Sequence, residues 1–374
     1  MKIASIVGAR PQFIKAAMIS LAIARGAGAN ASAPITETII HTGQHFDDNM
    51  SQVFFRDLDI PEPEYHLGIG GGSHGKNTGR MIEAIEAVLV KKRPDWAIVY
   101  GDTDSTLAGA LAAAKLHIPV AHVEAGLRSY NRKMPEEINR IVADQLSTLL
   151  FCPTRTAVEN LEKEGFPHRL SHQTRQMMVD VGDVMYDAAL YYGDRAEEKS
   201  RIMQALALKP KDFVLATIHR AENADDPIRL QHIMTALNRI AGEIPVVLPL
   251  HPRTKKKIVM TDFPAVSFID PIGYLDMVML EKNARVIITD SGGVQKEAYF
   301  HGTPCVTARD ETEWGELVET GANILAGAES DRIMAAFQQM LHKTIRTRRL
   351  YGNGDSAGKI ISALGSRLIR NTRV

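Results

Sequence analysis

The hydrophobic residues form short continuous runs that alternate with longer amphipathic stretches. In the first half of the chain the runs predict strands at 3–7, 38–41, 96–100, 120–123 and 148–151. The stretches at 13–25, 78–92 and 106–116 predict helices. Strands without polar alternation are typical of a parallel sheet that is covered by helices on both faces. The pattern therefore predicts a doubly wound α/β unit.

The same pattern starts again in the second half. Strand-like runs lie at 176–181, 213–218, 246–250, 266–269 and 286–289. We therefore expect an N-terminal Rossmann-like domain over 1–170, a second one over 171–355, and a C-terminal helix in 356–374 that packs back on the first domain. In such a protein the ligand is expected in a crevice between the two domains, at the carboxyl ends of the strands.

Composition limits the possible functions. The chain has 374 residues, which suits two domains, and 44 basic residues balance 44 acidic ones. A net charge of zero disfavours a general nucleic-acid or anionic-membrane binder. Cys152 and Cys305 give neither a disulfide framework nor a metal site. Because no apolar run is long enough to span a membrane and no signal-peptide pattern occurs, we expect a cytoplasmic protein.

The segment 288–298 has the most informative pattern. A predicted strand ends there in Ser291, Gly292 and Gly293, and a helical pattern follows. Glycines let backbone N–H groups approach an anion, and a helix N-terminus adds partial positive charge. Glu297, one turn into the helix, is placed to accept from a ribose hydroxyl. This predicts a nucleotide-diphosphate site; a plain tight turn is the alternative.

Basic residues follow other predicted strands. Arg10 and Lys15 flank the first strand-to-helix turn, where two cations suit a phosphate, although a solvated basic helix start is the alternative. His219 directly follows the strand at 213–218, where it could contact a diphosphate or act as an acid, unless it is a buried core histidine. His251 is a weaker candidate of the same kind.

Three acidic sites follow strands of the first half. Asp102 could act on a substrate or merely cap the next helix. Glu124 ends a buried strand and needs a partner, for which Arg128 is a candidate. Glu136 lies in a predicted first helical turn, where acids are favoured in any case. Three carboxylates in one crevice would be costly for stability and useful for proton transfer.

One glycine-rich segment, 70–76, matches both G-x-G-x-x-G and the first seven positions of a phosphate-binding P-loop. The preceding residues are rich in proline rather than strand-like, and Asn77 replaces the Ser or Thr that would hold Mg²⁺. We therefore interpret the segment as a flexible loop before a helix that begins at Thr78. A nucleotide-binding module based on Lys76 is the alternative.

Seven motifs in order give the chain a family resemblance. They are VGARPQFIK, YGDTDST, HVEAGLR, PEEINR, THRAEN, DSGGVQKEA and DETEW. The chain resembles the non-hydrolysing UDP-N-acetylglucosamine 2-epimerases over about residues 1–365. That resemblance implies a glycosyltransferase-B architecture, a homodimer, a role in cell-surface polysaccharide biosynthesis, and no metal or other cofactor.

The resemblance also implies a reaction. UDP leaves from C1, which acidifies the C2–H bond; a 2-acetamidoglucal forms, and protonation on the opposite face with re-addition of UDP gives the C2 epimer. Asp102, Glu124 and Glu136 would handle protons, and His219 would assist departure of the diphosphate. The other predicted contacts would bind the substrate; they are Arg10, Lys15, His251, Ser291, Gly292, Gly293 and Glu297.

Two positions depart from the family pattern. Gln12 replaces a usual glutamate, and Trp314 stands where an arginine is usual. The motifs GARPQFIK and ETEW resemble those of the branch that acts on UDP-2,3-diacetamido-2,3-dideoxy-glucuronate, so both that sugar and UDP-N-acetylglucosamine are open as substrates. A glycosyltransferase of the same fold and a hydrolysing relative are further alternatives.

Overall fold

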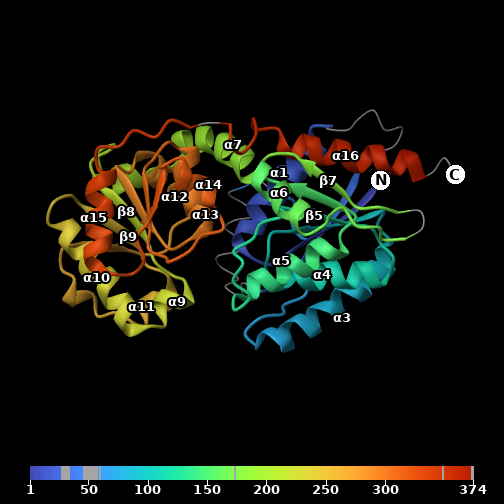
Figure 1. Cartoon of the computed structure of the whole chain (residues 1–374), viewed down its shortest axis with the longest axis horizontal. Coiled ribbons are helices and arrows are strands. Elements are labelled where there is room, and N and C mark those ends of the chain that lie inside the picture. The colour runs from blue at the N-terminus through green and yellow to red at the C-terminus, as the bar shows by residue number, and fades with distance from the viewer. Residues whose placement is uncertain (27–33, 45–57, 59, 172–173, 348, 372–374) are drawn as a thin grey trace. The chain divides into compact units, whose positions relative to one another are not determined.

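The computed structural model describes residues 1–26, 34–44, 58, 60–171, 174–347 and 349–371 (Figure 1). The chain divides into two compact units, Met1–Ala188 with Arg349–Val374, and Ala189–Arg348. Each unit contains one parallel sheet with helices on its faces. Within the described residues, no helix is both long and apolar enough to cross a membrane.

The first unit contains a seven-stranded parallel sheet in the order β3-β2-β1-β4-β5-β6-β7. Its strands are β1 (Lys2–Val7), β2 (Thr36–His41), β3 (Tyr65–His66), β4 (Trp96–Tyr100), β5 (Val120–Val123), β6 (Leu149–Cys152) and β7 (Met177–Asp180). Its helices are α1 (Arg10–Ala24), α3 (His74–Lys92), α4 (Asp104–Lys115), α5 (Pro135–Leu146), α6 (Arg155–Lys163) and α16 (Ser356–Asn371). Helix α7 (Val184–Lys199) leads from this unit into the second one.

Alternating strand residues build the core of this unit. Ile6 and Val99 face one side of the sheet, where they pack with Ile85 of α3 and Ala108 of α4. On the opposite side α1 lies beside α16, so the last helix of the chain completes the first unit (Figure 1). Because both faces are covered, the strands can be apolar throughout.

One predicted strand belongs to the other sheet. The run at 176–181 was expected to open the second domain, but β7 pairs in parallel with β6, with Met177 opposite Leu149. Hydrophobicity identifies a strand without saying which sheet it joins. The polar segment that suggests a boundary is instead a surface return, in which Arg169 and Arg175 form an antiparallel bridge. The first unit thus extends to Ala188, beyond the expected end at 170.

The second unit contains a six-stranded parallel sheet in the order β10-β9-β8-β11-β12-β13. Its strands are β8 (Val214–Thr217), β9 (Val246–Pro249), β10 (Val266–Ile269), β11 (Val286–Thr289), β12 (Cys305–Thr307) and β13 (Asn323–Leu325). Its helices are α8 (Ile202–Ala205), α9 (Ala221–Ala224), α10 (Pro227–Ala241), α11 (Pro252–Lys255), η1 (Met260–Asp262), α12 (Tyr274–Asn283), α13 (Gly292–Phe300), α14 (Gly315–Glu319) and α15 (Ser330–Met340).

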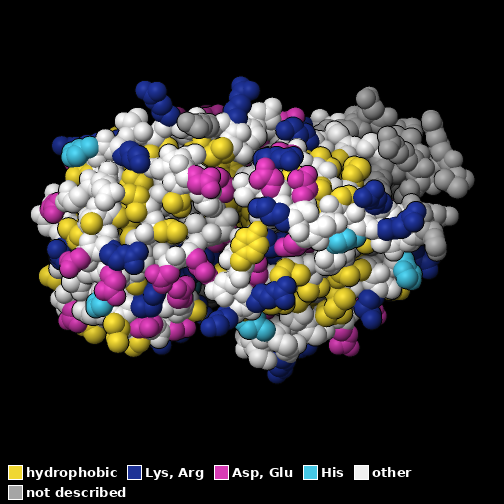
Figure 2. All heavy atoms as spheres, in the orientation of Figure 1, with side chains coloured by type: hydrophobic (Ala, Val, Ile, Leu, Met, Phe, Trp, Pro, Cys, Tyr) yellow, Lys and Arg dark blue, Asp and Glu magenta, His cyan; other side chains and the backbone are white. Residues whose placement is uncertain are grey.

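Neighbouring residues of β11 point into two different cores. Ile288 packs with α10 and α15, whereas Ile287 packs with α12 and α13. Over this unit, Figure 2 shows acidic and basic side chains interspersed on the visible face rather than gathered by sign. The surface therefore matches the balanced charge of the sequence.

Each sheet has a topological switch point, where the strand order reverses and ligands of such folds bind. In the first sheet β1 and β4 are neighbours, and their carboxyl ends lead into Arg10 and Asp102. In the second sheet β8 and β11 are neighbours, and their ends lead into His219 and Ser291. The predicted site residues thus follow the strands that flank both switch points.

Candidate functional site

Gly101, which follows β4, lies beside two predicted site residues. A Cβ atom on Gly101 would lie 3.1 Å from Oε2 of Glu124 and 3.2 Å from Nζ of Lys15. Lys15 and Glu124 form an ion pair in which their side chains are 6% and 9% exposed. Lys15 is therefore not part of a solvated basic helix start. Arg10, at the beginning of α1, is half-buried.

The backbone of Glu124 is strained. Its φ of +75° lies in the left-handed region, which costs energy for any residue with a Cβ atom. The conformation is fixed because the N–H groups of Glu124 and Ala125 both donate to the carbonyl of Phe151. Such strain is concentrated at functional sites, where it fixes the direction of a side chain.

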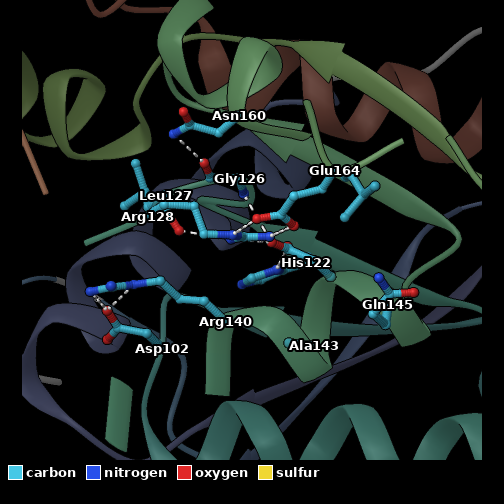
Figure 3. Close-up of polar contacts among 12 residues, drawn as sticks. Asp102, His122, Gly126, Leu127, Arg128, Arg140, Ala143, Gln145, Asn160 and Glu164 are labelled. Atoms are coloured by element: carbon cyan, nitrogen blue, oxygen red, sulfur yellow. Dashed lines mark hydrogen bonds and ion pairs between the residues drawn. The ribbon is translucent and has the colours of Figure 1, made fainter. Parts of the chain in front are cut away.

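Arg128 is not the partner of Glu124, so this prediction is wrong. Its Nη1 donates to Asp144 at 2.8 Å, and its Nε and Nη2 donate to the two oxygens of Glu164 at 2.7 and 2.8 Å (Figure 3). The chain turns at Gly126, where φ is +81°, between Glu124 and Arg128. Closeness in sequence therefore did not bring these two charges together.

Asp102 is bound by a buried arginine on α5. Nε and Nη2 of Arg140 lie 3.0 and 2.7 Å from Oδ2 of Asp102 (Figure 3). The capping alternative for Asp102 is wrong, because Thr103 is the N-cap of α4 and its hydroxyl accepts from Thr106. The two contacts from one guanidinium fix the direction of the carboxylate.

The two glutamates of the first turn of α5 differ in environment. Glu137 is buried, accepts from the N–H groups of Ser129 and Tyr130 at 2.9 and 3.0 Å, and pairs with Arg140. Burial alone would raise the pKa of Glu137, but these bonds and the arginine charge lower it. Glu136 is half-buried and makes no ion pair with any residue that the structure describes.

Gln12 holds three segments together, a role that the sequence did not reveal. Its Oε1 accepts from the N–H groups of Gly8 and Ala9 at 2.8 and 3.0 Å. Its Nε2 donates to the carbonyl of Tyr100 at 2.7 Å and to Thr106 at 3.0 Å. A glutamine with every hydrogen bond used inside the protein organises the β1–α1 turn.

In the second unit, Asp290 fixes the turn that presents His219. Its buried carboxylate accepts from the N–H groups of His219 and Arg220 at 3.0 Å and from Asn223 at 3.2 Å. Nδ1 of His219 lies 3.6 Å from the same carboxylate, and the side chain is 38% exposed. His219 is therefore not a core histidine. Its ring centroid lies 5.4 Å from that of His251, so the structure brings these two predicted contacts together.

The N-terminus of α13 has the predicted form. Ser291 is the N-cap, and Gly292 and Gly293 form the first turn. A Cβ atom on Gly292 would lie 2.3 Å from Oε1 of Glu313, so a larger residue here would displace that side chain. That carboxylate is also 3.0 Å from Arg309 and 3.7 Å from Arg220. An anionic group at this helix end, with arginines beside it, is what the dipole favours.

Two buried residues lie next to this turn. The Nζ of Lys296 lies 4.0 Å from the ring centroid of Trp314, and the two residues are 2% and 3% exposed. Glu297 is nearly buried one turn further along α13. Burial and the charge of Glu297 raise the pKa of the neighbouring Glu281 well above its ordinary value.

The glycine-rich segment at 70–76 has no P-loop geometry. The strand that precedes it most directly among the described residues, β3, is two residues long, and α3 begins at His74, four residues before the predicted start. Asn77 accepts from the N–H of Gly72 at 3.2 Å, and Lys76 is an exposed residue of the helix. The interpretation as a loop holds for residues 70–73, whereas residues 74–76 already belong to α3. Across the described ranges no cluster of His, Cys, Asp and Glu could hold a metal ion.

Comparisons with known proteins find similar chains of one family. A family model described as UDP-N-acetylglucosamine 2-epimerase matches residues 29–365. The chain is 53% identical to UDP-2,3-diacetamido-2,3-dideoxy-D-glucuronate 2-epimerase of Pseudomonas aeruginosa, covering 97% of this chain and 99% of that one. It is 42% identical to UDP-N-acetylglucosamine 2-epimerase of Methanocaldococcus jannaschii, covering 97% and 99%.

Solved structures show the same fold. The Methanocaldococcus jannaschii UDP-GlcNAc 2-epimerase in complex with UDP-GlcNAc and UDP matches with a TM-score of 0.88 at 42% identity, over 98% of this chain and all of that one. The Neisseria meningitidis enzyme bound to UDP-GlcNAc matches with a TM-score of 0.86 at 30% identity, over 99% of this chain and all of that one.

Proposed function

Since the chain belongs to the UDP-N-acetylglucosamine 2-epimerase family and is a UDP-sugar epimerase, we propose that it inverts C2 of a UDP-linked acetamido sugar by eliminating and re-adding UDP. The observation that carries this proposal is the group of carboxylates at the strand ends of the first unit. Simple glycosyl transfer does not need these proton carriers, which disfavours a glycosyltransferase of the same fold.

The second unit supplies groups that suit the leaving UDP. The N–H groups at the start of α13 and the hydroxyl of Ser291 would hold a phosphate, and Glu297 would accept from the ribose. His219 and His251 lie together beside the end of β8. An imidazole there would stabilise the negative charge that develops on the diphosphate as the C1–O bond breaks.

The three acids of the first unit have different surroundings, which suggests different roles. Asp102 faces the guanidinium of Arg140 and so suits stabilising positive charge on the sugar ring. Glu124 forms an ion pair with Lys15. A proton on Glu124, or a phosphate group bound by Lys15, would weaken this ion pair. Glu136, without an ion pair in the described part of the chain, suits carrying a proton to or from C2.

We favour UDP-2,3-diacetamido-2,3-dideoxy-glucuronate over UDP-N-acetylglucosamine as the substrate. The 53% identity to the Pseudomonas aeruginosa enzyme extends over nearly the whole of both chains. Trp314, at the position where the family usually has arginine, packs its ring on Lys296 beside the α13 turn. An indole in place of a bidentate cation changes how a polar group of the sugar is recognised.

The test is to incubate the enzyme with each sugar nucleotide in D₂O and follow C2 by NMR. Deuterium at C2 and a second epimer are expected, with the higher kcat/KM for the diacetamido-uronate. Glu124→Gln should lower kcat by about 100-fold or more with little change in UDP affinity. No exchange with either sugar would refute the proposal. Net transfer to an acceptor would indicate a glycosyltransferase, and free sugar with UDP would indicate a hydrolase.

The family resemblance also supports a homodimer that acts in the cytoplasm on a precursor of cell-surface polysaccharide. Light scattering of the purified protein would give its mass in solution, and a mass of one chain would refute the dimer. Fractionation of cells that express the chain would test its location.

A further inference from the structure

A buried histidine lies directly behind the Gly101–Asp102 turn. His122 is in the middle of β5 and is completely buried. Its Nδ1 lies 2.7 Å from Oδ1 of Asp144 on α5, and its Nε2 lies 2.7 Å from the carbonyl oxygen of Gly101. Both ring nitrogens are thus at hydrogen-bond distance from an oxygen.

Both of these oxygens are acceptors. A carbonyl oxygen has no proton to donate. The Asp144 carboxylate also accepts from Nη1 of Arg128 at 2.8 Å and from the N–H of Gly126 at 3.3 Å, and the guanidinium charge favours its ionised form. Burial alone would raise the pKa of Asp144, but the bond from His122 and the neighbouring charges lower it. Two acceptors require two donors, and an imidazole ring donates from both nitrogens only as the imidazolium.

The charges around His122 balance when it is protonated. Within the described residues, the ionisable groups linked to His122 through ion pairs are Asp144 on α5, Arg128 after β5 and Glu164 after α6, and the thiol of Cys152 lies on the neighbouring strand β6. Burial raises the pKa of Cys152 and keeps this thiol neutral. One arginine and one imidazolium then face two carboxylates. With a neutral His122, the cluster would carry one uncompensated negative charge.

The turn held by His122 bears a catalytic candidate. Gly101, with φ of +61°, leads directly to Asp102, whose own carbonyl accepts from Nδ2 of Asn139 at 2.9 Å. Side chains of β5 and α5 thus hold two successive carbonyl groups. With both carbonyls fixed, the Asp102 carboxylate can be directed at Arg140.

We propose that His122 is a permanently protonated positioning residue, whose imidazolium holds the Gly101 carbonyl and so fixes the orientation of the Asp102 carboxylate. The charge state follows from the hydrogen bonds alone, whereas the effect on turnover rests on the proposed epimerase function. The two parts therefore have separate tests.

The first test measures the charge without any substrate. Histidine labelled with ¹³C at Cε1 is incorporated into the deuterated full chain, and its Cε1–H signals are followed from about pH 6 to about pH 9. At the upper end exposed histidines are neutral, so we expect one signal at the imidazolium position, unchanged across the range and missing from His122→Gln. His301, buried in the other unit with a pKa lowered by burial to about 4, gives the neutral reference. Absence of an imidazolium signal at high pH would overturn the proposal.

The second test measures turnover. A glutamine can donate to only one of the two oxygens with the same geometry, so His122→Gln should lower kcat by about 10- to 100-fold with little change in KM. Loss of the positive charge should also move the acid limb of the kcat profile to higher pH. The exposed His342→Gln is the control. An unchanged pH profile and kcat would overturn the positioning role, while inactivity of the parent enzyme on both sugars would instead refute the proposed function.

Discussion

Arg140 donates to a single oxygen of Asp102 from two nitrogens of its guanidinium, at 3.0 and 2.7 Å. Its third nitrogen donates to Glu137 at 2.8 Å. One buried cation thus connects a catalytic candidate with a carboxylate that holds the loop at Ser129 and Tyr130. This arrangement makes α5 the helix that orients the acidic side of the site.

Replacement of Arg140 by lysine should impair turnover more than binding. A lysine keeps the charge but cannot make the forked contact, so Asp102 would lose its fixed direction. We expect kcat to fall by about 10- to 100-fold and KM to change by less than about threefold. Steady-state kinetics would show this, with Arg155→Lys on the exposed start of α6 as the control. An equal rise in KM would mean that Arg140 contacts the substrate itself.

The strain at Glu124 gives a prediction about stability. Glu124→Gly and Glu124→Ala both remove the carboxylate and the partner of Lys15, but only glycine relieves the positive φ. The glycine variant should therefore be the more stable of the two by about 1 kcal/mol. At Glu83, which is exposed within α3, the glycine variant should instead be less stable than the alanine variant by about 1 kcal/mol. Urea unfolding measures both differences, and the same order at both positions would contradict the strain.

Replacement of Gln12 by glutamate should lower the free energy of unfolding without changing the preference between the two sugar nucleotides. In Gln12→Glu a carboxylate oxygen would face the carbonyl of Tyr100 at the 2.7 Å distance now bridged by Nε2. A buried acceptor without a donor costs about 1–3 kcal/mol, which urea unfolding would detect. The exposed Gln231→Glu is the control. The ratio of kcat/KM for the two sugar nucleotides should stay the same; a tenfold change would show that Gln12 reads the sugar.

Asp187 should make the protein less stable as the pH rises. Burial raises its pKa from 3.8 to about 6, although the N–H groups of Ser356 and Ala357 oppose the shift. The contribution of Asp187 to the free energy of unfolding is therefore most favourable where its carboxyl is protonated in both the folded and the unfolded state. This contribution is lost between about pH 4 and pH 6, because the carboxyl ionises first in the unfolded chain. Asp187→Asn, which still accepts from Ala357, should be more stable by about 1–3 kcal/mol near pH 8 and no more stable near pH 4.

Unfolding curves at the two pH values measure this effect. Asp194→Asn, exposed on the same helix α7, should change stability little at either pH. A gain for Asp187→Asn that is equal at both pH values would contradict the role of ionisation.

The sequence predicted the parts of the site that depend on where strands end. Apolar runs and the residues after them identified the strand ends, so the positions of Asp102, Glu124, His219 and Ser291 at these ends were predicted from the sequence. It could not predict which charges pair, because Lys15 and Glu124 are far apart in sequence and meet only through the parallel order of the sheet. Arg128, four residues from Glu124, faces a different cluster.

Other features left only weak signals in the sequence. His122 is the polar residue of a short buried strand, and a polar residue in such a strand needs internal partners, but nothing indicated that these would be Asp144 and the Gly101 carbonyl. Likewise, β7 looked like any other strand, and only the pairing with β6 assigned it to the first sheet.

The placement of α16 has a consequence for synthesis in the cell. The N–H of Asp183 donates to the carbonyl of Tyr351 at 3.0 Å, and Lys359 donates to the carbonyl of Val181 at 3.1 Å, so the last segment is built into the first unit. A ribosome therefore releases residues 1–188 long before the helix that covers α1 has been translated. Until then, the nascent chain exposes an apolar surface that chaperones would recognise, and a truncation that removes α16 would leave this surface uncovered.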